Sequence, residues 1–173
     1  YWPYTDKPGA EPDGFDREPT AFCCSCARNY RTIQYFRYDS PFDMPRKDLL
    51  DRIKTFIAVN IPSMFGFAVY SSITQAAKTG GQDPISDTER GYIGGHAVVA
   101  VGYDDNMKIK NANPGGVETL GALLIRNSWS VTWSGNGYGW LPYDYVLNWL
   151  ARDWWSLLKS DWIDTDEFKF PEK

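Results

Sequence analysis

The hydrophobic and polar positions in the middle of the chain follow the periods of one helix and several strands. Over 45–60, apolar residues recur every three or four positions with charged residues opposite, which predicts an amphipathic helix. Pro45 suits the first turn of that helix, and Pro62 ends it. Stretches rich in apolar, β-branched and aromatic residues predict strands over 32–38, 64–70, 96–103, 120–127 and 138–141.

The segments between these elements carry weaker signals. A short helix is expected over 21–31, a long polar loop over 74–95, and turns over 104–119. Two further short helices are expected over 142–150 and 153–158. The strand 96–103 is almost entirely apolar, so we expect burial of both its faces. Because short connections join the strands, their pairing is predicted to be antiparallel, in an α+β fold with short flanking helices.

Composition and length argue against nucleic acid and membranes as partners and limit the number of domains. A chain of 173 residues with 43% hydrophobic residues suits one domain, or part of a larger one. A net charge of -4 argues against nucleic acid, which selects a basic face. No apolar run approaches the roughly 18 residues that cross a membrane, so no membrane association is predicted.

The first residues, Tyr1-Trp2-Pro3-Tyr4, include neither an initiating Met nor a basic signal region. We expect this start to be internal to a longer, processed polypeptide. For that reason the sequence makes no prediction for the compartment.

The three cysteines are clustered at Cys23, Cys24 and Cys26. An odd number at this spacing is a poor disulfide framework, and a metal site would need a fourth ligand. The only histidine lies 70 residues after Cys26. The sequence therefore predicts no metal and no cofactor, and the cysteines are interpreted as small, partly buried side chains on a short helix.

That single histidine, His96, begins an apolar strand directly after two glycines, which leave room beside its ring. Asn127 ends a neighbouring strand, where its side-chain oxygen would accept a hydrogen bond from one imidazole nitrogen. This bond would fix the tautomer and leave the other nitrogen facing a nucleophile. Trp129 and Trp133 would cover the hydrogen bond and exclude water. The alternative is a structural histidine beside a strand-end turn with a core tryptophan.

Two blocks of sequence carry a resemblance. Residues 95–103 (GHAVVAVGY) and 125–139 (IRNSWSVTWSGNGYG) resemble, in order and spacing, the histidine and asparagine blocks of the papain-like cysteine peptidases. The opening Trp2-Pro3-Tyr4 is similar to the Tyr-Pro-Tyr element that begins the second half of these enzymes. Residues 139–164 look more like prokaryotic members than lysosomal ones. The resemblance covers most of the chain, with only a loose match over 5–45.

The resemblance implies a papain-like fold, with an antiparallel sheet or barrel-like domain, and a peptidase mechanism. Residues 1–173 would form the C-terminal, β-rich part of the peptidase domain, without the helical half that bears the nucleophile. His96 would be the general base and ion-pair partner, Asn127 its orienting residue and Trp129 the shield. A cysteine thiolate would attack the peptide carbonyl and form an acyl-enzyme that water hydrolyses. The cysteine's backbone N–H and an upstream glutamine would form the oxyanion hole.

The resemblance also implies a pocket for one substrate side chain. Trp2, Pro3, Gly66, Gly94 and Ala97 are similar to positions that line the pocket for the second residue before the scissile bond. Glycine at two of these positions would make the pocket roomy and apolar. A bulky apolar substrate side chain is therefore expected there.

The nucleophile itself is missing from its usual place. In this family the histidine lies about 130–150 residues after the cysteine, and nothing in this chain is so far ahead of His96. Cys26 echoes the Cys-Gly-Ser-Cys-Trp motif, but it is too close to His96, Thr20 stands where the glutamine should be, and Ala27-Arg28 replaces the tryptophan. We therefore expect a two-part enzyme, with the cysteine on an N-terminal half or separate chain and a peptide or protein substrate in the cleft between them.

Two other functions stay open from the sequence. A relative that kept His96 and Asn127 but lost the nucleophile would bind peptides or inhibit true peptidases. A tryptophan-rich module that binds carbohydrate or protein would account for the tail, but it leaves the histidine and asparagine blocks unexplained.

Overall fold

The computed structural model describes residues 18–39, 44–76, 78–84 and 91–162. The chain divides into two compact units, one of Tyr1–Gln34 with Lys159–Lys173 and the other of Tyr35–Leu158. The second unit contains His96, Asn127 and Trp129, and the description below concentrates on it. Within the described ranges, no helix has the length and apolar character needed to cross a membrane.

Ten helices and strands follow one another along the described residues. They are α1 (Ala21–Ala27), β1 (Tyr30–Arg37), α2 (Arg46–Ala58), β2 (Ser63–Tyr70), α3 (Ile73–Ala76), β3 (Tyr92–Lys110), β4 (Glu118–Arg126), β5 (Tyr138–Pro142), α4 (Asp144–Leu147) and β6 (Ala151–Trp162).

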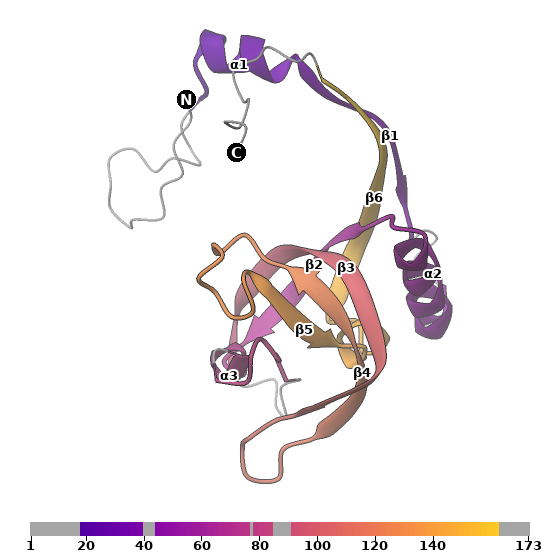
Figure 1. Ribbon diagram of the computed structural model, residues 1–173, viewed down its shortest axis with the longest axis vertical. Coiled ribbons are helices and arrows are strands. Elements are labelled where there is room, and N and C mark those ends of the chain that lie inside the picture. The colour runs from indigo at the N-terminus through magenta and orange to yellow at the C-terminus, as the bar shows by residue number, and fades with distance from the viewer. Residues whose placement is uncertain (1–17, 40–43, 77, 85–90, 163–173) are drawn as a thin grey trace, which may run out of the picture. The chain divides into compact units, whose positions relative to one another are not determined.

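The strands form one six-stranded sheet in the order β1-β6-β2-β3-β4-β5. Strands β2, β3, β4 and β5 run antiparallel to their neighbours, as Figure 1 shows. The sheet is open, because β1 and β5 lie at its two edges in the described part of the chain. The expected antiparallel sheet with few, short helices is confirmed.

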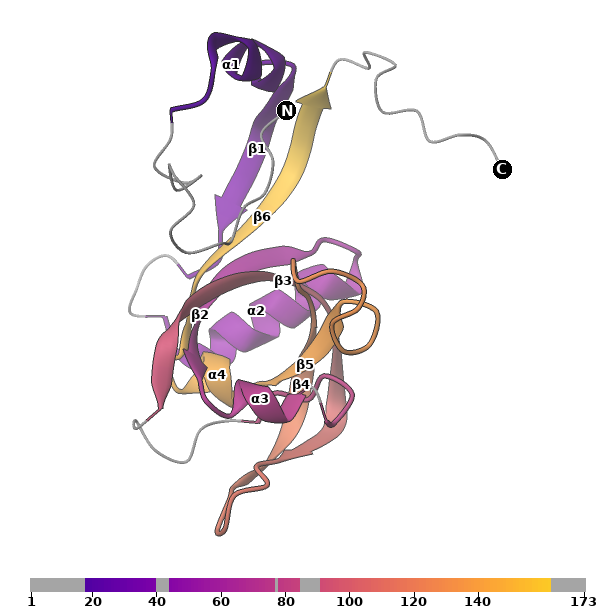
Figure 2. The ribbon, with the colours of Figure 1, turned by 90° about the vertical axis from the view of Figure 1, so that its left-hand side faces the viewer.

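The hydrophobic core of the larger unit lies between the sheet and helix α2. The apolar side of α2 packs Leu49, Leu50, Ile53 and Ile57 against the strands, which is the face that the sequence period predicts. Figure 2 shows α2 lying across the strands. Pro45 is the N-cap residue of α2, one position before its first turn. Trp154 is fully buried and stacks on Phe65 with 3.9 Å between ring centroids.

The expectation of a helix over 153–158 is wrong, since these residues belong to β6. Trp154 and Ser156 are buried while Leu157 is exposed, and this alternation is typical of a strand with one face on the core. The alternation is broken at Asp153, where the backbone takes a left-handed conformation with φ 62°. That break hides the strand period in the sequence.

Strand β3 also differs from its prediction. It begins four residues before His96 and continues to Lys110, so the expected loop and turn segments are shorter than predicted. Its two faces are not both buried. Val98 and Ala100 face the core, whereas Val101 and Tyr103 are each 37% exposed. Small and apolar residues on both faces of this strand concealed the alternation.

Candidate active site

His96 and Asn127 come together from adjacent strands of the sheet. His96 lies in β3, and Asn127 directly follows β4, which pairs with β3 in an antiparallel register. The Nε2 atom of His96 lies 2.9 Å from Oδ1 of Asn127. The pairing expected from the sequence is therefore present in the structure.

A second hydrogen bond decides the direction of the first. Oδ1 of Asn127 also accepts the backbone N–H of Ser128 at 2.7 Å. Because a backbone N–H can only donate, this side-chain atom is the amide oxygen, and Nε2 of His96 must donate its proton to it. In the neutral imidazole, Nδ1 then carries the lone pair, and it has no hydrogen-bond partner among the described residues.

Asn127 is held in place by the turn that follows β4. Its backbone N–H donates to the carbonyl of Gly137 at 2.9 Å, and the N–H of Gly137 donates to Trp133 at 2.8 Å. Asn127 is only 6% exposed, although it is polar. Its amide oxygen is satisfied by two donors, so burial does not leave it unpaired.

Two indoles cover the histidine and asparagine. Trp129 stacks on His96 with 4.7 Å between ring centroids, and Trp133 lies edge-on to Trp129 at 5.6 Å. Gly139 makes room for this arrangement, since a Cβ atom there would lie 2.8 Å from the ring of Trp133. The stack keeps one face of the imidazole away from water, which strengthens its hydrogen bond.

The sequence analysis did not single out the residue on which the imidazole rests. Phe67 is the cross-strand partner of His96, and its ring meets the imidazole edge-on at 6.0 Å. Tyr145 packs against the other side of Phe67 and is fully buried. The pairing register of β2 and β3 would have identified Phe67, because directly opposite residues share a face of the sheet.

A buried carboxyl lies deeper in this unit. Asp83 is 3% exposed, and burial raises its pKa to about 7. Its Oδ1 has no hydrogen-bond partner among the described residues. The pKa of Tyr145 lies far above its ordinary value because of burial and, secondarily, the charge of Asp83. Tyr145 is therefore neutral near pH 7, whereas Asp83 is about half protonated there and becomes neutral at lower pH.

Two hollows flank the histidine and asparagine. One has a volume of about 460 Å³ and includes His96 and Phe67, with a floor of Gly66, Ala68 and Gly95. The other has a volume of about 560 Å³ and borders Asn127, Ser128 and Ala97. The histidine and asparagine thus lie between two open hollows of this unit.

The predicted substrate-binding residues fall in different places. Gly66 lines the hollow that contains His96, while Ala97, its cross-strand partner, borders the second hollow. Gly94 lies opposite Val69, and it is not among the residues that line these two hollows. Trp2 and Pro3 lie outside the described residues.

The three cysteines lie on α1, in the other unit of the chain. In the described ranges, no three His, Cys, Asp or Glu side chains come together as metal ligands would.

Comparison with known proteins identifies the group to which this site belongs. A model of the papain family of cysteine proteases matches residues 1–146. An uncharacterized peptidase C1-like protein of Acanthamoeba polyphaga mimivirus is 33% identical over 135 residues, which are 75% of this chain and 38% of the viral protein.

Solved structures show the same fold. Xylellain, a cysteine protease from Xylella fastidiosa, is 30% identical with a TM-score of 0.66, over 90% of this chain and 53% of xylellain. The cysteine protease and lectin-like domains of Cwp84 from Clostridium difficile share only the fold, at 21% identity and a TM-score of 0.56, over 95% of this chain and 33% of that one. The chain thus spans about half of xylellain and less of the others. On its sequence and its fold, it belongs to the papain family of cysteine proteases.

Proposed function

We propose that this chain provides the base-bearing part of a cysteine-type peptidase, whose nucleophilic cysteine comes from an upstream segment or a separate chain. Residues 1–173 would then be the C-terminal, β-rich part of the peptidase domain. Peptides or proteins are the substrates, bound across the two hollows beside His96.

The observation that carries this proposal is the hydrogen bond from Nε2 of His96 to Asn127. It holds the imidazole in the tautomer whose Nδ1 accepts a proton. A histidine kept only for packing does not need a buried amide to select its tautomer or an indole stacked over its ring.

The mechanism follows from this tautomer. Nδ1 of His96 takes the proton of the thiol, and the imidazolium stabilises the thiolate beside it. The thiolate sulfur bonds to the carbonyl carbon, and the C–N bond breaks as the imidazolium protonates the leaving amine. Water then gives a proton back to Nδ1, attacks the thioester and releases the acid and the thiol. Throughout, Asn127 holds the ring orientation and Trp129 excludes water from the hydrogen bond.

The limited span of the chain supports a thiol from elsewhere. The chain covers 53% of xylellain and 38% of the viral relative, so much of each relative has no counterpart here. The unit that carries His96 contains no cysteine, because the three in the sequence all belong to the other unit. The same observation favours a second candidate function, a peptide-binding relative without a nucleophile.

Labelling and mass analysis separate the two candidates. Native material is treated with a thiol-directed epoxide, and every polypeptide is then weighed intact. A label on an upstream segment or co-purifying chain, lost in His96→Ala, supports the peptidase. No label and no peptide cleavage would establish the non-catalytic relative. A label on Cys26 would place the nucleophile inside this chain and overturn the two-part enzyme.

A further inference from the structure

We propose that Arg152 makes the hollow beside His96 selective for an acidic side chain of the peptide substrate. This inference rests on the proposed peptidase function and adds a substrate class to it. It differs from the bulky apolar side chain that the sequence leads one to expect. Four features of the larger unit support it: the floor of the hollow, its walls, its charge and the backbone that presents Arg152.

The floor of the hollow is bare of side chains. Arg152 in β6 lies opposite Gly66 in β2, which in turn lies opposite Ala97 in β3. Opposite residues in a sheet project to the same face, so these three form one row across three strands. Gly66 and Arg152 line this hollow, while Ala97 at the end of the row borders the other one. The next row on that face pairs Ala68 with Gly95. Apart from Arg152, no residue in these two rows carries more than a methyl group.

Larger side chains border this bare floor. Tyr70, Tyr92, Trp149 and Leu150 line the hollow together with His96 and Arg152. Strands lie roughly 4.8 Å apart, so Arg152 is about 10 Å across the sheet from the strand that carries His96. By the same rule, His96 and its partner Phe67 project to the opposite face of the sheet, and His96 borders this hollow from its place in β3. A substrate side chain that crosses the bare face from β3 toward β6 therefore extends over glycine and alanine toward a guanidinium.

Arg152 is the unneutralised charge in this hollow. Its Nε donates to the carbonyl of Trp149 at 2.9 Å, and no carboxylate among the described residues pairs with it. Asp153 also borders the hollow, but its Oδ1 pairs with Arg37 at 3.1 Å and accepts the indole N–H of Trp155 at 2.9 Å. A carboxylate that enters thus meets one available cation and one carboxylate already engaged.

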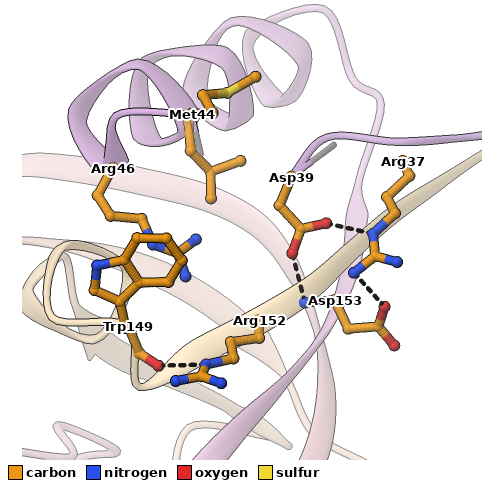
Figure 3. A pocket seen from close by; sticks show the side chains of 8 residues that line it. Arg37, Asp39, Met44, Arg46, Trp149, Arg152 and Asp153 are labelled. Atoms are coloured by element: carbon orange, nitrogen blue, oxygen red, sulfur yellow. Dashed lines mark hydrogen bonds and ion pairs between the residues drawn. The ribbon is translucent and has the colours of Figure 1, made fainter. Parts of the chain in front are cut away.

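A second guanidinium, that of Arg46, lines a neighbouring hollow, which shares Trp149 with this one. Arg46 lies over the ring of Trp149, 3.4 Å from its centroid, and its buried Nε has no hydrogen-bond partner in the described part of the chain. Burial lowers the pKa of Arg46; Asp39 acts in the opposite direction and Arg152 in the same direction. Figure 3 shows Arg46 beside the indole of Trp149 and Arg152 at the backbone carbonyl of the same residue.

A bulge in β6 presents Arg152 to the hollow. Met64 pairs with Trp155 and Gly66 with Arg152, so two residues of β6 face the single residue between Met64 and Gly66. The first of the two, Asp153, has the left-handed φ of 62°. Bulges of this kind redirect side chains next to active sites.

An ionic cluster fixes the bulge in this form. Asp39 accepts the backbone N–H of Asp153 at 2.8 Å and the Nε of Arg37 at 2.7 Å, while Arg37 also reaches Asp153 (Figure 3). Burial alone would raise the pKa of Asp39, but these donors and the charge of Arg37 lower it below its ordinary value. The carboxylate therefore stays ionised, and the backbone at Arg152 is held in one direction.

This geometry selects a carboxylate over other side chains. The remaining nitrogens of Arg152 form a planar fork that matches both oxygens of an aspartate or glutamate. A neutral side chain leaves the cation unpaired when the hollow is closed by substrate, and a lysine is repelled. The preference should weaken in high salt, because the hollow is open and the charges are partly screened.

The test uses the assembled peptidase, this chain together with its thiol-bearing segment. Peptides differ only by Glu, Leu or Lys, placed in turn at each of the three positions before the scissile bond. At one position we expect kcat/KM for Glu to exceed that for Leu by about tenfold, the size of a charged hydrogen bond. Arg152→Gln should remove this preference and leave cleavage of the Leu peptide within about twofold. Arg152→Glu should shift the preference to Lys, and Lys47→Gln, an exposed loss of the same charge, should change nothing.

The possible outcomes distinguish a failure of this inference from a failure of the proposed peptidase function. Efficient cleavage of the Leu peptide with no Glu preference, unchanged in Arg152→Gln, overturns the inference while the peptidase proposal stands. If Arg152→Gln lowers kcat/KM equally for the Glu, Leu and Lys peptides, Arg152 has a structural role, and the inference is overturned. If no peptide is cleaved and no thiol is labelled by the epoxide, the peptidase proposal itself fails, and the acidic preference fails with it.

Discussion

The indole of Trp129 lies within 25° of parallel to the imidazole of His96, with 4.7 Å between the ring centroids. The stack covers one face of the ring whose Nε2 donates to Asn127. Phe67 supports the imidazole edge-on from the neighbouring strand. Imidazole, amide and indole therefore form one cluster in the part of the chain that has no cysteine, and the contribution of each can be tested separately.

The histidine tautomer can be tested without any enzymatic activity. The chain has one histidine, so ¹⁵N-labelled histidine gives a single, unambiguous imidazole signal. We expect a protonated Nε2 whose proton exchanges slowly with water, and an unprotonated Nδ1 at neutral charge. Asn127→Ala should abolish the slow exchange. A protonated Nδ1 in the wild-type protein would contradict the arrangement described here.

The same substitution should impair catalysis in the assembled enzyme. Asn127→Ala removes the acceptor for His96 and for the amide of Ser128, two partly buried hydrogen bonds. With about 1–3 kcal/mol for each lost partner, kcat/KM should fall roughly ten- to a hundredfold or more. The control is Asn106→Ala, at the exposed bulge of β3, which should leave kcat/KM unchanged. An unaffected Asn127→Ala enzyme would remove Asn127 from the mechanism.

Loss of the indole shield should have a smaller effect. Trp129 is 42% exposed, so its removal opens the hydrogen bond to water without creating a large buried cavity. Trp129→Ala should lower the rate of epoxide labelling about three- to tenfold, in line with an aromatic contact of ~0.5–1.5 kcal/mol. Trp129→Phe, which keeps a ring over the imidazole, should restore most of the rate. Equal rates for all three proteins would show that the stack is incidental.

Asp83 should make the protein less stable as the pH rises. Its pKa is about 7 in the fold against 3.8 when exposed, so the folded state holds the proton more tightly than the unfolded state. The free energy of unfolding therefore falls between about pH 4 and pH 7, by on the order of 4 kcal/mol for this group. Urea unfolding across this range should show a flatter pH profile for Asp83→Asn. Asp51→Asn, at an exposed carboxylate, is the matched control and should follow the wild-type slope.

Gly139→Ala tests how tightly the shield is packed. The added methyl would lie 2.8 Å from the ring of Trp133 and 2.8 Å from the carbonyl of Gly81. Overpacking of this kind costs about 1–3 kcal/mol, which thermal unfolding would detect. Gly94→Ala has no atom within 4 Å of the added methyl and should leave the melting temperature unchanged. Equal melting temperatures for both variants would mean that the tryptophan packs loosely.

Local signals carried most of the fold prediction. The helix α2 and the strands β2, β4 and β5 follow from periodicity and from Pro45 and Pro62, because each has one clearly apolar face. Strand β6 did not follow, because the bulge at Asp153 interrupts its alternation. A bulge is stabilised by partners distant in sequence, here Asp39, and no local pattern reveals them.

The candidate site shows the same contrast between residues with a local sequence signal and residues that depend on distant contacts. His96, Asn127 and Trp129 were identified because each stands in a distinctive local context, and the structure brings them together. Phe67 and Arg152 were not, since their roles depend on register across the sheet. Arg152 also lies next to the segment that was expected to be helical, so its position beside Gly66 was hidden by the missed strand.

The strand order has a consequence for biosynthesis. Among the described strands, β6 is the last to be made, yet it lies between β1 and β2 in the sheet. While the chain emerges from the ribosome, β1 and β2 each present an unpaired backbone edge that can recruit another nascent chain. A premature stop before Ala151 would leave those edges permanently uncovered, so truncated forms should aggregate rather than accumulate as folded fragments.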